Sequence, residues 1–449
     1  MRNPHSTLRD KDVQEQAVAL LQSHLRLKDY SSKATTAVVC HVLFFAAACL
    51  TSIAAACRRL RDAPCDDTLH KALRATLPAF AELQRRVGRA LAASLPRVLR
   101  HPRRRQRLRM AIDLTLIPYH GQPEADPKEI YRGQAKRGTS HFHAYASAYL
   151  VLHGQRYTVA LLPVAKGEKM ENVVYQLRDL ARKAGIRPRL LLLDRGFYSV
   201  GVIRHLQAAR VPFVMPAIAR GRKATKERPA TGTRAFASWK RSGWSTHTLK
   251  DATGRPATVA ICVHCGNYRG QWKRHGRFTW LYACWGISST STRWVAETYR
   301  QRFGIETSYR QMNEARIKTC SRSPALRFLF VALALLLRNV WVWFHWEVLS
   351  GRRRGRRRLC LERLPFKTLL SWLQAVAVAA LGLCTDIETE RGYQQQVSPV
   401  QSDEGDWELL SLVKYHSPNG YLAIPAEIPI ALSFFDCGGG DGIQVQSGR

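Results

Sequence analysis

Three carboxylates in this sequence stand at positions where acidic side chains could do chemistry. Asp113 interrupts the apolar run Met110–Pro118, and Asp194 comes directly after the apolar run Leu190–Leu193. A carboxylate inside an apolar strand is costly unless it has a partner, so Asp113 needs one. Glu306 lies in the middle of a long polar stretch. Together, three such oxygen ligands could bind one or two divalent cations and act on a phosphodiester bond.

The polar stretch around Glu306 has the spacing of a helix, predicted over Trp294–Lys318. Five polar residues follow one another at offsets of 3, 4, 3 and 4 and so share one helix face: Tyr299, Arg302, Glu306, Tyr309 and Asn313. Arginine is a forked donor for phosphate, and tyrosine can stack on or contact a nucleotide. A solvated face laced with surface ion pairs is the alternative interpretation of the same spacing.

The segments around the two aspartates indicate the elements that must position them. Apolar alternation and turn residues predict three strands, then a helix, a strand, a helix and a strand: Met110–Pro118, His141–His153, Arg156–Val164, Glu171–Gly185, Leu190–Leu193, Val200–Arg210 and Pro212–Pro216. The short, wholly apolar strand before Asp194 is typical of the centre of a parallel sheet. If its strand neighbours that of Asp113, both carboxylates converge at one sheet edge, where ligands of α/β sheets gather. A strand-end aspartate that only forms a turn or caps the next helix is the alternative.

Changes in composition and in predicted secondary structure divide the chain into four predicted domains. Residues 1–100 are helical, and 108–320 form the α/β core, with a β-rich insertion over 217–292. Residues 321–384 contain apolar helices and the arginine cluster 351–358, and 385–449 form an acidic, partly disordered tail. Within the first domain, Ser52–Leu60 and Thr68–Leu77 are a possible helix-turn-helix for DNA, with a plain helical hairpin as the alternative.

The charge of the chain indicates a polyanionic partner. Lys and Arg number 70 against 33 Asp and Glu, a formal charge of +37, and a further arginine-rich stretch spans Arg97–Arg109. Nucleic acid is the expected partner, because neutralised phosphates release counterions, and an anionic membrane surface is the competitor.

Three apolar runs test the membrane alternative: Val38–Cys57, Phe328–Trp346 and Leu369–Cys384. The first holds polar residues, the second is interrupted by Arg338, Asn339 and His345, and the third is short for a membrane span. We therefore expect buried helices and no membrane partner. The first 30 residues lack the apolar stretch of a signal peptide, and dispersed cysteines suit an intracellular protein.

One cysteine pair has metal-ligand spacing. Cys262 and Cys265 form the only CxxC of the chain, and a zinc site would need His275 or Cys284 as partners. We favour the interpretation that both cysteines are ordinary strand residues.

The combined motifs IDLTLIPYHG around Asp113, LLLDRGFYSV around Asp194 and YRQRFGIETSYRQMNEARIKT around Glu306 resemble DDE transposases of bacterial and archaeal insertion sequences. The similar branch has a β-rich insertion before its catalytic glutamate and a Tyr-Arg-Glu-Lys signature around it. This resemblance implies a ribonuclease-H-like core, cut-and-paste movement through hairpin DNA ends, and a homodimeric synaptic complex.

The resemblance also implies roles for individual residues. Asp113, Asp194 and Glu306 would be the catalytic metal ligands for Mg²⁺ or Mn²⁺, two ions being expected. Tyr299, Arg302 and Arg195 would contact DNA phosphate. Asn313 stands where the signature has its lysine, so either that phosphate contact is lost or Arg310, Arg316 or Lys318 supplies it.

The function expected from these observations is a Mg²⁺-dependent transposase that binds double-stranded DNA at transposon ends and target, in the cytoplasm and associated with the nucleoid. Two other classes remain as alternatives. The first is a metal-dependent nuclease that never joins strands, and the second is a DNA-binding protein without catalysis. Cleavage and strand-transfer assays discriminate between them.

Overall fold

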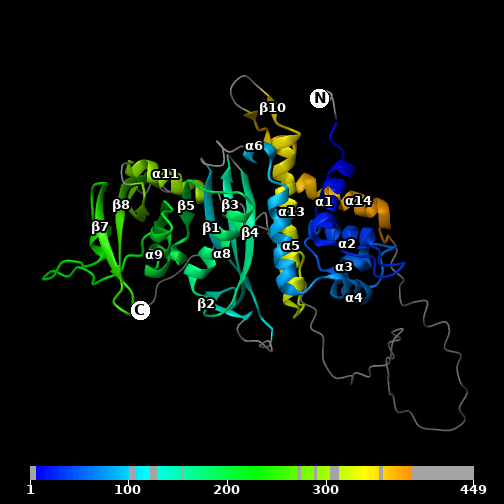
Figure 1. The fold of residues 1–449 in the computed structure, drawn as a ribbon, viewed down its shortest axis with the longest axis horizontal. Coiled ribbons are helices and arrows are strands. Elements are labelled where there is room, and N and C mark those ends of the chain that lie inside the picture. Colours follow the sequence, from blue (N-terminus) through cyan, green and yellow to red (C-terminus); the bar gives the residue numbers. More distant parts are fainter. Residues whose placement is uncertain are drawn as a thin grey trace, which may run out of the picture. The chain divides into compact units, whose positions relative to one another are not determined.

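A nine-stranded mixed sheet is the centre of the computed structural model, which describes residues 7–100, 108–121, 129–152, 155–269, 275–287, 291–303, 313–352 and 357–385. The strands lie in the order β2-β3-β1-β5-β6-β9-β8-β7, and β4 also pairs with β3 (Figure 1). Their bounds are β1 Arg109–Pro118, β2 Tyr131–Lys136, β3 Thr139–Leu152, β4 Gln155–Val164, β5 Leu190–Leu193, β6 Phe213–Pro216, β7 Gly243–Lys250, β8 Pro256–Arg269 and β9 His275–Trp285.

The pairing of the first strands follows the predicted topology. β1 is antiparallel to β3, and β3 to β4, whereas β1, β5 and β6 run parallel. Helix α8 (Met170–Lys183) precedes β5, and α9 (Val200–Ala208) connects β5 to β6. The predicted fold class is therefore confirmed: an α/β protein with a ribonuclease-H-like core. The short strand β2 was not predicted.

The two faces of the sheet carry different helices. Met110 and Ile112 of β1 belong to the large core that contains the buried residues of α8 and α9. Ala111, between them, belongs to a second core with Val295 of helix α11 (Thr292–Phe303). Because successive strand residues point to opposite faces, α11 packs on the face opposite α8 and α9.

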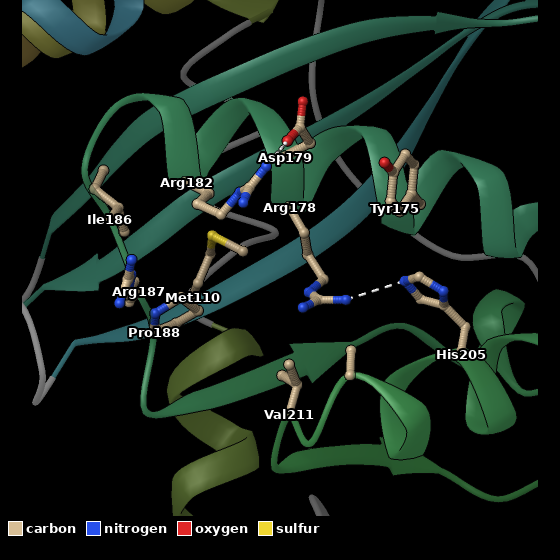
Figure 2. Close-up of a pocket in the computed structure, with 11 residues that line it drawn as sticks. Met110, Tyr175, Arg178, Asp179, Arg182, Ile186, Arg187, Pro188, His205 and Val211 are labelled. Carbon is tan, nitrogen blue, oxygen red and sulfur yellow. Dashed lines mark hydrogen bonds and ion pairs between the residues drawn. The ribbon is translucent and has the colours of Figure 1, made fainter.

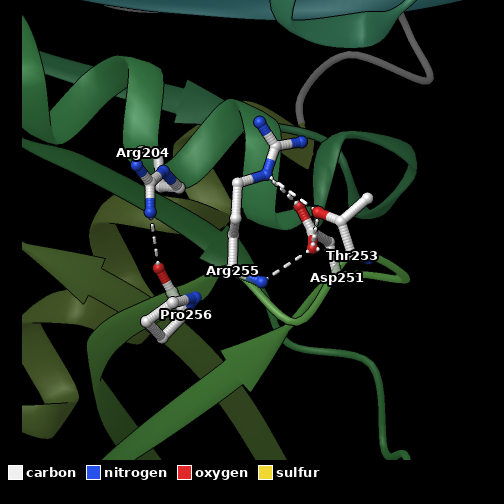
Figure 3. A network of polar contacts seen from close by, with 5 residues as sticks. All are labelled: Arg204, Asp251, Thr253, Arg255 and Pro256. Atoms are coloured by element: carbon white, nitrogen blue, oxygen red, sulfur yellow. Dashed lines mark hydrogen bonds and ion pairs between the residues drawn. The ribbon is translucent and has the colours of Figure 1, made fainter.

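The β-rich insertion extends the main sheet instead of forming a separate one. β9 pairs antiparallel with β6, and β8 and β7 follow in turn. Arg204 of α9 donates to the carbonyl of Pro256 at 3.1 Å, which ties the start of β8 to the core (Figure 3). In the β7–β8 turn the Asp251 carboxylate accepts from the backbone N–H groups of Thr253 and Arg255. The core helix and this turn together hold the insertion in register.

The N-terminal and C-terminal helices share one hydrophobic core with the sheet, and the predicted boundaries between four domains stay predictions. The N-terminal helices are α1 Asp10–Leu25, α2 Thr36–Ala48, α3 Ile53–Arg59, α4 Asp66–Thr76, α5 Phe80–Ala93 and α6 Arg97–Arg100. The C-terminal ones are α13 Pro324–Glu347 and α14 Phe366–Leu381, with the short strands β10 Gly351–Arg352 and β11 Arg357–Arg358 between them. The predicted tail lies outside the described residues from 386 onward.

The apolar run Val38–Cys57 is not one helix. α2 ends at Ala48, Leu50 has a positive φ of 52°, and the Ser52 hydroxyl caps α3 by accepting from the N–H of Ala55. The two helices meet at an angle of 105°. The cap and the left-handed residue together explain the bend.

Two described segments are long and apolar enough to cross a membrane by length and composition alone: Pro324–Glu347 and Leu361–Leu381, with the bent α2–α3 pair as a third if it is counted as one span. The apolar window of the first is 94% buried inside the protein, and that of the second 39%. Burial in the protein core accounts for the apolar composition of α13.

Asn339 explains one of the polar interruptions in α13. Its side chain is fully buried and bonds both backbone groups of Thr158 on β4, accepting from the N–H at 2.9 Å and donating to the carbonyl at 2.7 Å. A bulge in the β3–β4 pairing falls beside this point. The Asn339 amide thus makes the two backbone hydrogen bonds that a neighbouring strand would otherwise make, at the point where the pairing of β3 with β4 is irregular.

We expect Asn339→Leu to lower the free energy of unfolding by about 3 kcal/mol, because it leaves two buried backbone groups of Thr158 without partners. Urea denaturation of the full chain, followed by circular dichroism, measures the change. Asn172→Leu, the same substitution at an exposed position of α8, is the control and should change stability by less than about 0.5 kcal/mol. Equal stability of the two variants would contradict the structural role of Asn339.

Candidate active site

Asp113 and Asp194 lie on neighbouring parallel strands. Ile112 of β1 is paired with Leu193 of β5; Asp113 is the next residue of β1, and Asp194 directly follows β5. The four residues of β5 are all buried, so the strand is fixed on both faces and delivers Asp194 at its carboxyl end. The expected convergence of two carboxylates at one edge of the sheet is therefore observed.

The two carboxylates have different surroundings. Asp113 is only 5% exposed, and its Oδ1 accepts from the N–H of Leu114 at 2.8 Å. The side chain of Asp194 is 41% exposed. Asp194 makes no capping bond to the short helix Arg195–Phe197, and the hydroxyl of Ser199 caps α9 instead. The alternative that Asp194 is merely a helix cap is wrong.

One guanidinium group joins the two aspartates. Nη2 of Arg302 lies 3.3 Å from Oδ1 of Asp113 and 3.1 Å from Oδ1 of Asp194. Arg302 is itself buried. Burial alone would lower the pKa of Arg302, but Tyr299 and the two carboxylates together raise it. Arg302 therefore holds a permanent positive charge between two negative ones.

Tyr299 fixes the approach of α11 to this sheet edge. It is 1% exposed, and its hydroxyl donates to the carbonyl of Leu193, the last residue of β5, at 3.2 Å. Nη1 of Arg302 donates to the same hydroxyl at 2.8 Å. Burial raises the pKa of Tyr299, so the phenol stays protonated and remains a donor. The backbone of β5 thus positions Tyr299, and Tyr299 positions Arg302.

A second buried arginine, which sequence reasoning missed, supports the end of α11. Nη2 of Arg156 on β4 donates to the carbonyl of Arg302 at 2.6 Å. The Arg156 guanidinium lies 4.8 Å from the ring centroid of Tyr149 on β3. The available signal was a charged residue inside the apolar strand Arg156–Val164, where burial requires a partner.

Of the remaining predicted site residues, the described part of the chain places only Arg195 next to an aspartate. Glu306 and Arg310 lie outside the described residues. Arg195 is exposed beside Asp194. The predicted helix does not reach Lys318, because the chain has no regular structure from 316 to 323, and the Lys318 N–H donates to the carbonyl of Thr51. The predicted phosphate contacts of Tyr299 and Arg302 stay predictions, since both side chains are buried here against protein groups.

The two carboxylates at this site are suitable ligands for a hard divalent cation, but the third predicted ligand is not among the described residues. Two carboxylates already share a cationic partner, and carboxylate oxygens are ligands that Mg²⁺ and Mn²⁺ prefer. Among the described residues no group of three His, Cys, Asp or Glu side chains could hold a metal ion, and the predicted third ligand, Glu306, is not among them. The same finding offers no support for zinc at Cys262 and Cys265 within this part of the chain.

Comparison with known proteins places the chain in a family. The family described as transposase DDE domain matches residues 104–340, more than half of the chain. One similar solved structure is the cryo-EM structure of piggyBac transposase in a synaptic complex with hairpin DNA. Its TM-score is 0.43 at 11% identity, with 89% of this chain and 77% of that chain covered. No curated protein matches this sequence. By the family match, this chain belongs to the DDE-domain transposases.

Proposed function

We propose that this protein binds transposon ends and catalyses metal-dependent cleavage and strand transfer of double-stranded DNA. The observation that carries the proposal is the position of Asp113 and Asp194 directly after Ile112 and Leu193, a paired position of two adjacent parallel strands, in a chain that belongs to a transposase family. By the resemblance in its motifs, water nicks the transposon end, and the freed 3′-hydroxyl then forms the hairpin. A 3′-hydroxyl later joins the target.

Asp113, Asp194 and Glu306 would hold Mg²⁺ or Mn²⁺ in this proposal. Bound there, two such ions activate a nucleophile and stabilise the leaving oxygen of an in-line displacement. The role of Arg302 follows from its position: it offers one positive charge to both Asp113 and Asp194 and holds the two carboxylates close together. Arg302 and a divalent cation would compete for these two carboxylates, and an Arg302 side chain freed from them would be available to a DNA phosphate.

The partner and location follow from the same proposal. A formal charge of +37 and the exposed Arg195 beside Asp194 suit a DNA backbone at this edge. A homodimer that holds two DNA ends, in the cytoplasm and at the nucleoid, is the expected assembly. The helix pair α3–α4 is the proposed further DNA contact.

We expect Asp113→Asn, Asp194→Asn and Glu306→Gln each to reduce cleavage at least about 10³-fold, because each loses an anionic metal ligand. DNA binding should stay nearly unchanged. The substrate is a plasmid carrying the DNA that flanks this reading frame on both sides, and Asp62→Asn at an exposed site is the control.

Normal cleavage by any of the three variants would contradict the site assignment. Cleavage by the wild-type chain without joining to target DNA would instead support the nuclease alternative. DNA binding without any cleavage would support the non-catalytic one.

We expect Arg302→Gln to lower the free energy of unfolding by about 3 kcal/mol without divalent ions, because two carboxylates lose their shared buried cation. Mg²⁺ should then raise the melting temperature of Arg302→Gln more than that of the wild type. The double variant Asp113→Asn with Arg302→Gln is the control and should lose this Mg²⁺ response. An equal Mg²⁺ response in all three chains would show that the ion does not bind between these carboxylates.

We expect DNA affinity to fall steeply with salt. A protein that contacts about six phosphates loses roughly 10³-fold in affinity between 50 and 200 mM salt, through counterion uptake by the freed DNA. Fluorescence anisotropy of a labelled duplex across this salt range measures the slope. A flat response would contradict a phosphate-dominated interface.

A further inference from the structure

A cavity of about 480 Å³ lies on the other face of the sheet, between α8 and α9 (Figure 2). Met110 of β1 lies in its floor, whereas Asp113 is on the opposite face with α11. The cavity is also at the other end of β5, beside Pro188, two residues before that strand begins. It is therefore separate from the proposed active site, and its volume is within the range of small-ligand pockets.

The lining of this cavity is strongly basic. Arg178 and Arg182 come from α8, and Arg187 from the loop that follows it. Among the described residues that line the cavity, Asp179 has the only carboxylate, which already binds Arg182 at 2.8 Å and Lys183 at 2.7 Å. The positive charges of Arg178 and Arg187 are not balanced by the lining itself.

Arg178 shows this imbalance most clearly. Its Nη1 lies 3.0 Å from Nε2 of His205, and no carboxylate within the described ranges forms an ion pair with it. A histidine nitrogen accepts from a guanidinium only when the ring is neutral. Burial and the nearby Arg178 lower the pKa of His205, which favours that neutral form. The contact therefore orients the guanidinium without neutralising it, and an anion would complete the site.

An aromatic side chain lies at the edge of the same cavity. Tyr175 is 58% exposed, although large apolar side chains are rarely so open in this protein. Its ring meets that of His205 edge to face, with centroids 5.7 Å apart at 83°. The exposed face of an aromatic ring is the usual platform on which a nucleic acid base stacks.

We propose that this cavity binds one nucleotide unit, its phosphate at Arg178 and Arg187 and its base on Tyr175. Planar guanidinium groups match phosphate oxygens, and the tyrosine supplies stacking without base specificity. The nucleotide comes either from a free nucleoside phosphate or from an unpaired residue of a DNA strand. The site does not depend on the catalytic assignment of Asp113 and Asp194, so either proposal can fail alone.

The test is titration of the full chain with the fluorescent nucleotide mant-ATP at physiological ionic strength and without divalent ions. The chains compared are the wild type, Arg178→Gln, Arg187→Gln and Tyr175→Ala. Arg85→Gln removes the same charge from an exposed site on α5 and is the matched control. This control matters because a chain of charge +37 attracts any polyanion.

We expect the Kd of mant-ATP to rise about tenfold in Arg178→Gln and Arg187→Gln, and at least about fivefold in Tyr175→Ala. Arg85→Gln should bind like the wild type. Arg187 is exposed in a loop, so its substitution tests the site even if Arg178→Gln folds poorly. Displacement of the probe by a short oligothymidylate would indicate a DNA nucleotide, and displacement by unlabelled ATP alone a free one.

Two results would overturn the proposal. One is the absence of saturable binding by the wild type. The other is an equal loss of affinity in Arg85→Gln and the three cavity variants, which would show that the probe is attracted by the overall positive charge and not bound in the cavity.

Discussion

The electrostatic problem of two carboxylates side by side, one within β1 and one just after β5, determines much of this structure. Asp113 and Asp194 follow paired residues of β1 and β5, and one of them is almost completely buried. Like charges so placed require a cation between them. Arg302 provides it, and α11 must therefore dock where its guanidinium reaches both groups.

The sheet supplies the rigidity that this arrangement needs. β5 is buried on both faces, its last carbonyl accepts from Tyr299, and the insertion continues the same sheet beyond β6. Helix α11 rests on one face while α8 and α9 cover the other. Two chemically distinct surfaces result from a single layer of strands: an acidic edge bridged by arginine, and an arginine-lined cavity behind it.

Elements with strong local patterns were predictable from the sequence. The strand Leu190–Leu193 was predicted with its observed bounds, and the neighbouring strands and helices within a few residues, because period and turn residues are local signals. The helix start at Ser52 was predicted as well, because its cap is a local signal. The loss of helix before Lys318 was not predicted, since the Lys318 N–H bonds the carbonyl of Thr51, a tertiary contact. The convergence of Asp113 and Asp194 was predicted from topology. The ion pairs of Arg302 with these two aspartates were not predicted, because the periodicity of a sequence does not show which side chains pair over a long separation.

The bond between Asn339 and Thr158 has a consequence for synthesis of the chain. The two residues are 181 positions apart, so the strands β1, β3 and β4 leave the ribosome long before α13 does. At usual rates of translation this interval is about 10–40 s. During that time the backbone of β4 at Thr158 lacks its final partner and is open to pairing with other chains. Nascent copies of this protein are thus most vulnerable to aggregation before residue 339 has been made.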